Sequence, residues 1–205
     1  KEGESGMRLK ELLGSRIFWI LFFMMICAGA SEQAVSQWAS AFAEEGLHIS
    51  KTIGDLAGPM TFAVFMGTSR AFYGKYGEHI HLERFMAGSA FLCILSYLGI
   101  SLLPLPQLSL ACCALCGLSV GIMWPGTFSK ASAALPGGGT ALFALLALGG
   151  DLGCSAGPTV VGFVSGAAGD NLKMGILAGA VFPAVLLLGI VLCEKNHGNS
   201  QRNRA

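Results

Sequence analysis

The alternation of apolar and polar residues divides the chain into six long apolar stretches separated by short polar breaks. A helix needs about 20 mostly apolar residues to cross a membrane, because all its backbone polar groups must be paired within the segment. Each of the stretches is long enough to meet this demand. The pattern therefore predicts six membrane-spanning helices, at residues 17–41, 53–72, 85–103, 108–133, 140–167 and 174–193.

The breaks contain residues that end helices or form turns. They are Glu44 to Gly46, a polar turn from Arg70 to Arg84, Pro104 with Pro106, Pro136 to Gly139, and Asp170 with Asn171. None is long enough to hold a soluble domain. We expect a polar lead-in at 1–16, a transmembrane bundle at 17–193 and a polar tail at 194–205. Because the chain begins at Lys1, we also expect it to be either part of a longer protein or a tagged product that begins at Met7.

Composition agrees with a membrane protein. Hydrophobic residues make up 53% of the chain, charged residues only 12%, and the mean hydropathy is +0.63. A soluble domain carries about 25% charged residues. The net charge of +1 provides no basic face for phosphate backbones, so nucleic acid is excluded as a partner. The predicted fold class is an all-α integral membrane protein whose partner is the lipid bilayer.

The positions of Lys and Arg predict the orientation, since cytoplasmic loops hold the excess of these residues. If both termini are cytoplasmic, eleven of the 13 basic residues lie on the cytoplasmic side, and Lys51 and Lys173 lie outside. We therefore predict that both termini are cytoplasmic and that the chain is integral to the plasma or inner cell membrane.

The seven Cys residues do not indicate a metal site or a cofactor. Cys113 and Cys116 have the spacing of a zinc-binding pair, but a zinc site needs further ligands and no His lies beside them. We interpret the Cys residues as small space-filling side chains and expect no cofactor.

Two acids lie well inside the predicted spans, Glu32 in the first and Asp151 in the fifth. A charged group at the centre of a membrane helix costs on the order of 3 kcal/mol, so such residues are functional candidates. Glu32 shares one face of its helix, within an arc of about 140°, with other polar or small residues. They are Gly29, Gln33, Ser36, Gln37 and Ser40. This face is predicted to line a cavity or a helix contact, whereas Trp38 lies off it and is interpreted as an interfacial anchor.

Asp151 lies among glycines that permit close approach of another backbone. It binds either a solute or proton, or it forms a buried hydrogen bond that joins helices. Pro125 and Pro158 permit bends in their helices, which are either hinges or static kinks.

An intramembrane enzyme is an alternative. The segment from Gly153 to Gly157 fits a nucleophile elbow around Ser155, and Asp151 with Asp55 could form an acid pair. The four His residues, at 48, 79, 81 and 197, all lie in predicted loops or the tail, so Ser155 has no evident base. A third interpretation is a membrane scaffold without transport activity.

The chain resembles the carboxy-terminal six helices of a major facilitator superfamily (MFS) transporter, with a leaning toward the fucose-permease-like carriers. The lead-in from Glu2 to Arg16 resembles the central loop of such carriers, and the segment from Gly67 to Lys75 resembles their basic loop after the second helix. The run from Gly153 through Pro158 to Gly162 is similar to their glycine and proline motif. Ala71 stands where the family loop has Asp, and the glycine motif has one extra residue.

This resemblance implies two inverted three-helix repeats, as do similar Gly-Asp-Leu and Gly-Pro sequences in the second and fifth spans, at 54–59 and 150–158. It also implies that the first and fourth helices line the cavity, which adds Trp124 to Glu32, Gln33, Ser36 and Gln37. We expect an alternating-access carrier of a small polar solute, a symporter if it is proton-coupled. Six helices form half of such a cavity, so a second six-helix half is expected, either in the same protein or in another chain.

Overall fold

The computed structural model describes residues 7–47 and 50–202. These residues form helices joined by turns, and no strand occurs among them. The outer ends of the predicted lead-in and tail, residues 1–6 and 203–205, lie outside the described residues, as does His48.

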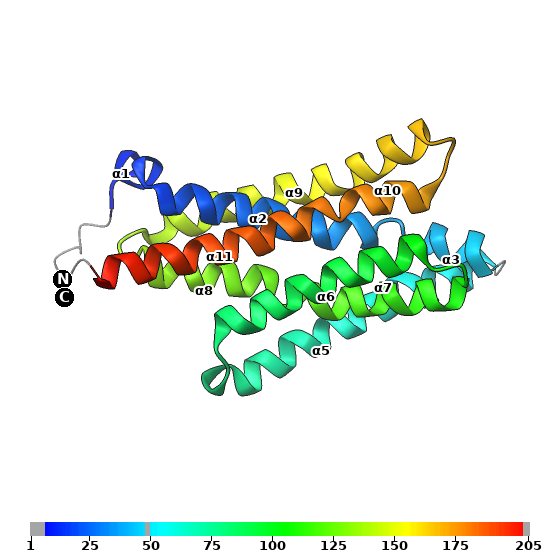
Figure 1. Cartoon of the computed structure of the whole chain (residues 1–205), viewed down its shortest axis with the longest axis horizontal. Coiled ribbons are helices and arrows are strands. Elements are labelled where there is room, and N and C mark those ends of the chain that lie inside the picture. Colours follow the sequence, from blue (N-terminus) through cyan, green and yellow to red (C-terminus); the bar gives the residue numbers. More distant parts are fainter. Residues whose placement is uncertain (1–6, 48–49, 203–205) are drawn as a thin grey trace.

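Six helical segments run along the bundle in alternating directions, so that α1 and the end of α11 lie at the same end (Figure 1). We call this the terminal end. A short helix, α1 (Leu9–Gly14), precedes them. The segments are α2 (Arg16–Ser36) with α3 (Ala39–Leu47); α4 (Lys51–Asp55), the π-helical turn η1 (Leu56–Met60) and α5 (Thr61–Tyr76); α6 (Leu82–Leu102); α7 (Pro106–Val120) with α8 (Met123–Ala134); α9 (Gly139–Ala167); and α10 (Leu172–Gly179) with α11 (Val181–Arg202). The 3-10 turn η2 (Gly77–His79) joins α5 to α6.

Five of these segments are long and apolar enough to cross a membrane, judged over the described residues. They correspond to the first, third, fourth, fifth and sixth predicted spans. The second predicted span, which contains α4, η1 and α5, is the one that does not meet this criterion. Thr68, Ser69 and Arg70 lower its hydropathy, and Pro59 lies inside its π-helical turn. The six helical segments are present, but the membrane-spanning character of the second does not follow from its hydropathy.

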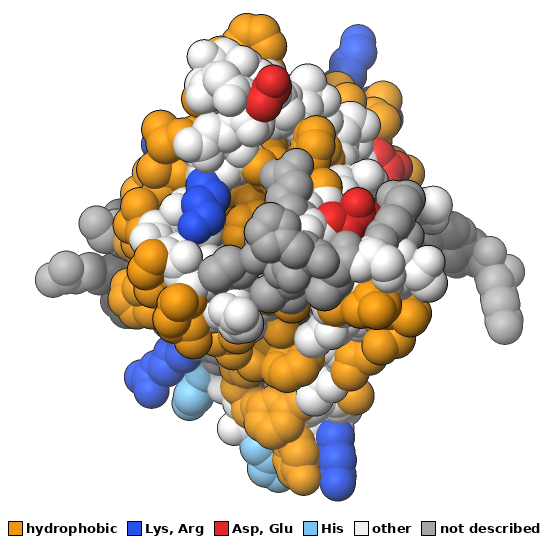
Figure 2. All heavy atoms as spheres, turned by 90° about the vertical axis from the view of Figure 1, so that its right-hand side faces the viewer, with side chains coloured by type: hydrophobic (Ala, Val, Ile, Leu, Met, Phe, Trp, Pro, Cys, Tyr) orange, Lys and Arg blue, Asp and Glu red, His pale blue; other side chains and the backbone are white. Residues whose placement is uncertain are grey.

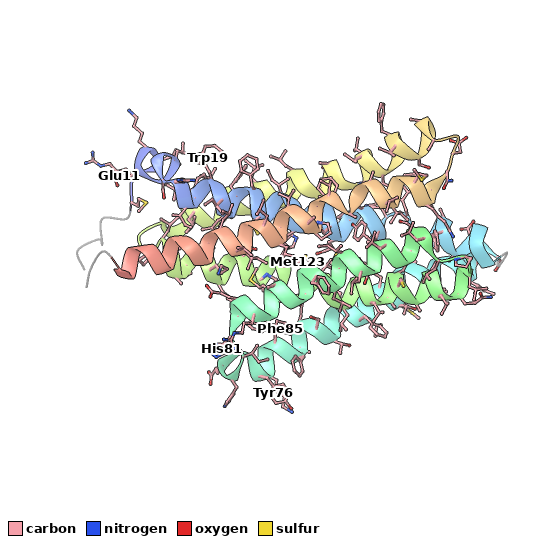
Figure 3. The ribbon with its side chains drawn as sticks, in the orientation of Figure 1. Glu11, Trp19, Tyr76, His81, Phe85 and Met123 are labelled. Atoms are coloured by element: carbon pink, nitrogen blue, oxygen red, sulfur yellow. The ribbon has the colours of Figure 1, made fainter. Side chains whose placement is uncertain are left out.

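The predicted polar turn from Arg70 to Arg84 is wrong over its first half. The α5 helix continues to Tyr76, so the basic segment from Gly67 to Lys75 is helical rather than a loop. Aromatic packing explains the extension, because the ring of Tyr73 stacks on that of Phe85 in α6 at 5.8 Å between centroids. The true turn contains η2 and lies between Tyr76 and His81 (Figure 3).

The α2 and α9 helices make the most extensive contact in the bundle, and small residues form it. A Cβ atom on Gly153 would overlap the carbonyl oxygen of Ile26, and one on Gly157 would come within 2.5 Å of the Ala30 carbonyl oxygen. The glycines predicted to permit close packing therefore bring the two backbones together.

The α5 helix packs on α7 in a similar way, since a Cβ atom on Gly117 would overlap the Phe62 carbonyl oxygen. The first segment thus pairs with the fifth and the second with the fourth, while α6 packs on α10 and α11. A two-fold axis that exchanges the first three segments with the last three converts the pair of the first and fifth segments into the pair of the fourth and second. The helix packing therefore fits the predicted inverted repeats.

The similar sequences at 54–59 and 150–158 can be compared by the contacts of their glycines. Gly58 and Gly157 both precede a proline, yet both contact the first segment. A Cβ atom on Gly58 would lie 2.6 Å from the Ala39 carbonyl oxygen. The η1 turn that contains Gly58 also contacts α7 of the fourth segment, which is the contact that an exchanged position would make.

Trp38, which was predicted to be an interfacial anchor, packs on α9. Its ring is half-buried, packs beside Gly162 and directs its Nε1 toward the carbonyl oxygen of Pro158 at 3.4 Å. The turn between α2 and α3 rotates this side chain onto α9. Trp19, by contrast, is exposed near the terminal end (Figure 3), where its Nε1 donates to the Leu13 carbonyl oxygen at 2.8 Å.

The outside of the bundle is largely apolar. The view onto the end opposite α1 shows hydrophobic side chains over the flanks and few charged ones (Figure 2). Near that end, the α9–α10 turn uses positive φ angles at Gly169 and Asp170, and the Asn171 side chain caps α10 by accepting from the Met174 amide. Apolar flanks with polar turns are the pattern expected of a bundle surrounded by lipid.

Candidate functional site

Glu32 lies in α2 at the point where three helices meet. One turn before it, a Cβ atom on Gly29 would overlap the carbonyl oxygen of Gly150 in α9. On its other side Gly150 lies against the indole of Trp124 from α8. The absence of side chains at Gly29 and Gly150 therefore brings α2, α8 and α9 together beside the Glu32 carboxylate.

Arg70 of α5 is the counter-charge of Glu32. Its Nη2 lies 3.5 Å from Glu32 Oε2, and the Glu32 side chain is 14% exposed whereas that of Arg70 is 43% exposed. The Nε of Arg70 donates to the Gly121 carbonyl oxygen at 3.2 Å, at the break between α7 and α8. The guanidinium therefore joins α2, α5 and the α7–α8 break.

The Glu32–Arg70 contact is an ion pair without hydrogen-bond geometry. Glu32 Oε2 is buried and has no hydrogen-bond donor among the described residues. Since an ionised carboxylate accepts several hydrogen bonds, this oxygen can take a donor from a bound molecule.

The other polar residues predicted on this face of α2 are accessible to differing degrees. Gln33 and Ser36 are half-buried and Gln37 is exposed. The Gln37 amide donates to the Gln33 side-chain oxygen at 3.3 Å. The first helix therefore presents a continuous polar face that extends from Glu32 to Gln37.

Trp124 of α8 packs on α9 at Gly150, the residue that also contacts Gly29 of α2. Its ring is half-buried against Gly150, and its Nε1 is buried without a hydrogen-bond acceptor within the described part of the chain. An indole N–H usually finds a partner when it is buried. Glu32 Oε2 and Trp124 Nε1 thus provide one free acceptor and one free donor on adjacent helices.

Asp151 follows Gly150 in α9, and its side chain is exposed. An exposed Asp151 side chain does not form a buried hydrogen bond to another helix of this chain. The exposed face of α9 also holds Leu148, Leu152 and Ser155. Asp151 therefore forms part of a polar spot on an otherwise apolar helix face.

Tyr97 of α6 contacts α2 next to Glu32. It is fully buried, and its hydroxyl donates to the Ser31 carbonyl oxygen at 2.8 Å. Because Ser31 precedes Glu32, this bond fixes the height and rotation of α2 where the carboxylate lies.

The geometry gives little support to a serine nucleophile. The Ser155 hydroxyl donates to the Asp151 carbonyl oxygen at 3.2 Å, which is an ordinary bond within a helix. The side chain of Asp55, the second member of the proposed acid pair, lies outside the described residues. Within the described part of the chain, no three His, Cys, Asp or Glu residues are placed to hold a metal ion.

Sequence reasoning missed Arg70 and Tyr97 as parts of the site. Arg70 was assigned to a loop, although it lies within the second predicted apolar stretch, where the cost of a charge in the membrane marks a functional candidate. Tyr97 carries no such signal, because a Tyr in an apolar helix is common and its partner is a backbone carbonyl group on another helix.

Comparison with known proteins agrees with this architecture. The sequence profile of the Major Facilitator Superfamily matches residues 1–158. Comparison with curated proteins gives no matching sequence. Among solved structures, the crystal structure of a single-residue variant of the E. coli fucose:proton symporter FucP is similar, with a TM-score of 0.82 and 18% sequence identity.

The match to that symporter covers 94% of this chain and 47% of the symporter chain. This chain therefore spans about half the length of the similar structure, and the likeness confirms at the level of fold the resemblance to fucose-permease-like carriers. With its helical bundle, its apolar spans and its match to the family profile, the chain belongs to the Major Facilitator Superfamily.

Proposed function

We propose that this chain forms one half of a secondary carrier that moves a small polar solute across a membrane by alternating access. The observation that carries the proposal is the junction of α2, α5, α8 and α9. There Glu32 pairs with Arg70, and Gly150 contacts both Gly29, one turn before Glu32, and the indole of Trp124, whose Nε1 has no acceptor among the described residues. Charged and unpaired polar groups are costly inside a bilayer, which favours a functional reason for placing them together.

The solute class follows from the groups that remain free. Glu32 Oε2 accepts a hydrogen bond, Trp124 Nε1 donates one, and the amides of Gln33 and Gln37 do both. The indole provides an apolar surface beside them. A small hydroxylated solute such as a polyol satisfies all of these groups, whereas a purely apolar ligand leaves the buried donor and acceptor unpaired.

Proton coupling is a further part of the proposal. A proton on Glu32 removes the charge that attracts Arg70, so the proton and the guanidinium compete for the same carboxylate. Loss of the ion pair frees Arg70 to move away from α2 while it stays bonded to Gly121 at the α7–α8 break. This would connect proton binding to the relative positions of α2 and α8.

A second six-helix half is the proposed partner, and the exposed face of α9 supports it. Leu148 and Leu152 are 52% and 50% exposed, and Asp151 and Ser155 lie on the same face. Direct contact of a charged Asp with lipid costs on the order of 3 kcal/mol, which a water-filled cavity or a polar neighbour removes. The α9 face is therefore suited to a protein partner across an aqueous cavity.

The proposed orientation places both termini in the cytoplasm. The terminal end holds the α5–α6 turn, with Lys75 and Arg84 close to it, and the α8–α9 turn near Lys130 (Figure 1). Lys173 lies near the opposite end, at the start of α10. This distribution follows the rule that basic residues concentrate on the cytoplasmic side, and we propose the plasma or inner cell membrane as the location.

The function is tested by binding and uptake of labelled polyols, sugars and amino acids, with the purified chain and with proteoliposomes that also contain its six-helix partner. Glu32→Gln and Arg70→Gln should each weaken binding at least tenfold, whereas Glu11→Gln, on the exposed α1 helix, should leave it unchanged. Glu32→Gln should also abolish the dependence of uptake on a pH gradient.

Ser155→Ala separates the carrier from the alternatives. A carrier should keep its solute binding in this variant, whereas loss of peptide or lipid cleavage would favour an enzyme. If no solute binds and only assembly suffers in Glu32→Gln and Asp151→Asn, the chain is a scaffold and the carrier proposal is wrong.

A further inference from the structure

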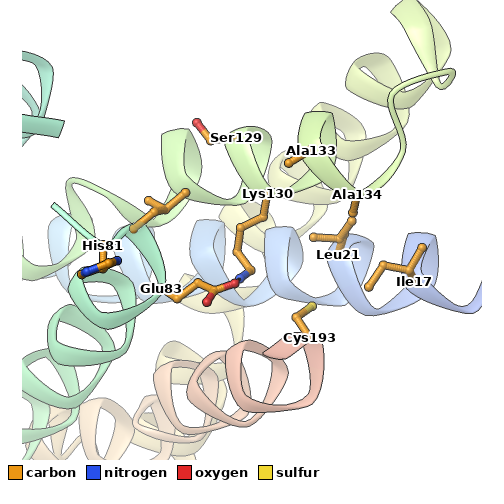
Figure 4. A pocket seen from close by; sticks show the side chains of 10 residues that line it. Ile17, Leu21, His81, Glu83, Ser129, Lys130, Ala133, Ala134 and Cys193 are labelled. Atoms are coloured by element: carbon orange, nitrogen blue, oxygen red, sulfur yellow. Dashed lines mark hydrogen bonds and ion pairs between the residues drawn. The ribbon is translucent and has the colours of Figure 1, made fainter. Parts of the chain in front are cut away.

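A cavity of about 240 Å³ lies near the terminal end of the bundle, away from the Glu32 site (Figure 4). Side chains from α2, α6, α8 and α11 form it. Most of its wall is apolar, and the polar groups gather on one side, where Lys130, Glu83, His81 and Ser129 lie. The apolar wall consists of Ile17, Leu21, Leu82, Ala133, Ala134 and Cys193.

Lys130 is the unusual residue of this cavity. Its side chain is only 9% exposed, and its Nζ bonds to Glu83 Oε1 at 2.7 Å. An ammonium group has three N–H donors. The bond to Glu83 uses one of them, and within the described part of the chain no second acceptor bonds to this nitrogen. A nearly buried ammonium therefore has donors available on the cavity side.

Glu83 does not fully neutralise this environment. Its side chain is 47% exposed, so water hydrates the carboxylate while Lys130 stays largely shielded. Arg84, which follows Glu83 in α6, is exposed and adds a positive charge near the opening. The balance of charge at the opening favours an anion.

The cavity lies near one end of the apolar spans, which in a bilayer is the level of the boundary between headgroups and acyl chains. Ile17 is the second residue of α2, His81 precedes α6, and Ala134 ends α8. Cys193 lies inside α11 but ends its apolar span, so the lining lies near the ends of the apolar spans. The rim residues Ser129 and Ala133 are exposed, and the cavity is therefore open to its surroundings. An amphiphile in the adjacent leaflet has its polar group at this level.

We infer that this cavity binds an anionic lipid, with an acidic headgroup oxygen on Lys130 Nζ and the start of an acyl chain on the apolar wall. A free inorganic anion would leave that wall uncovered, so the apolar lining favours the lipid. Glu83 occupies one ammonium donor and repels the headgroup, which makes it a competitor of the ligand. In the proposed orientation the lipid comes from the cytoplasmic leaflet.

Binding at this position has a structural consequence. Lys130 belongs to α8, which follows the break at Gly121 and Ile122, and Glu83 belongs to α6. A headgroup on Lys130 would replace or extend the link between these two helices. The lipid would thus influence the position of α8, whichever solute the protein carries.

The test uses the full chain, delipidated in detergent and titrated with phosphatidylglycerol, phosphatidylcholine or inorganic phosphate. Bound lipid is counted by native mass spectrometry, and the melting temperature is recorded in parallel. Phosphatidylglycerol should bind and raise the melting temperature, and phosphatidylcholine and phosphate should not. Lys130→Gln should weaken phosphatidylglycerol binding at least tenfold, and Ala134→Phe should weaken it by filling the cavity.

Glu83→Gln gives the sharpest result, because removing a competitor should strengthen phosphatidylglycerol binding severalfold. The matched control is Lys173→Gln, since Lys173 is also a half-buried lysine whose Nζ donates at 2.7 Å, to the Leu103 carbonyl oxygen. This variant should bind as the unmodified chain does.

Three results would overturn the inference. They are unchanged binding in Lys130→Gln, weaker binding in Glu83→Gln, which indicates a zwitterionic headgroup or a purely structural ion pair, and equal stabilisation by inorganic phosphate. If Lys130→Gln does not fold, Glu83→Gln and Ala134→Phe decide the question.

Discussion

The Arg70 guanidinium contacts the Glu32 carboxylate at 3.5 Å, and the same side chain donates to the Gly121 carbonyl oxygen at 3.2 Å. One arginine thus connects the polar face of α2 to the break between α7 and α8. Any molecule or proton that changes the charge of Glu32 acts directly on this connection. The ion pair is therefore both a part of the candidate site and a link between helices.

The first prediction concerns the energy of this pair. Arg70→Gln leaves a largely buried carboxylate without its counter-charge, so this variant should be less stable than the double variant Glu32→Gln with Arg70→Gln. The coupling energy should be about 1 kcal/mol, because one partner is partly exposed to solvent. Thermal unfolding in detergent of the two single variants and the double variant measures it.

Arg84→Gln serves as the control for that cycle, since Arg84 is an exposed arginine near the start of α6. It should leave stability unchanged. Additive effects of the two substitutions at Glu32 and Arg70 would show that the pair contributes no interaction energy.

The second prediction concerns the contact between α2 and α9. Gly153→Ala places a Cβ atom against the Ile26 carbonyl oxygen and should destabilise the protein by about 2 kcal/mol, because the two backbones must separate. Gly166→Ala is the matched control in the same helix, since no described residue of another segment lies within 4 Å of a Cβ atom there. It should be neutral or stabilising by about 0.5 kcal/mol. Equal melting temperatures for the two variants would contradict the close packing.

The third prediction concerns Tyr97. Tyr97→Phe removes the hydroxyl that donates to the Ser31 carbonyl oxygen and should cost about 1 kcal/mol of unfolding free energy. Solute binding should weaken as well, because α2 loses a contact beside Glu32. Tyr76→Phe, at an exposed position of α5, should change neither quantity. A Tyr97→Phe protein as stable as the unmodified chain would show that packing alone holds α2 in place.

Much of the fold was predictable because the cost of an unpaired backbone in lipid imposes long helices. The six segments, the glycine contacts of α9 and the polar face around Glu32 all follow from residue spacing along one helix. The second segment was predicted less well. Because charged residues follow one another from Arg70 to Arg84, Arg70 was assigned to a loop. The α5 helix continues past it, and the packing of Tyr73 on Phe85 explains why.

The features that could not be predicted share a physical cause, which is that contacts between helices are not encoded in the residue spacing along one helix. Trp38 reaches α9 because a turn interrupts the first segment, and Gly58 lies against Ala39 of the first segment. Arg70 and Tyr97 join the site through partners on other helices. The sequence identified the polar groups of α2 but could not identify what they face.

The last prediction uses the contrast between two tryptophans. The Nε1 of Trp38 points to the Pro158 carbonyl oxygen, whereas that of Trp124 has no acceptor among the described residues. Trp38→Phe should therefore lower the unfolding free energy by about 1 kcal/mol, and Trp124→Phe should lose no hydrogen bond and cost less. Trp124→Phe should weaken solute binding more than Trp38→Phe does, because the indole of Trp124 lies at the α2–α8–α9 junction that holds Glu32. The measurement is the change in tryptophan fluorescence on solute addition, which should persist in Trp38→Phe and disappear in Trp124→Phe. A signal that survives in Trp124→Phe would place the solute away from this indole, and the donor at Nε1 would then need another explanation.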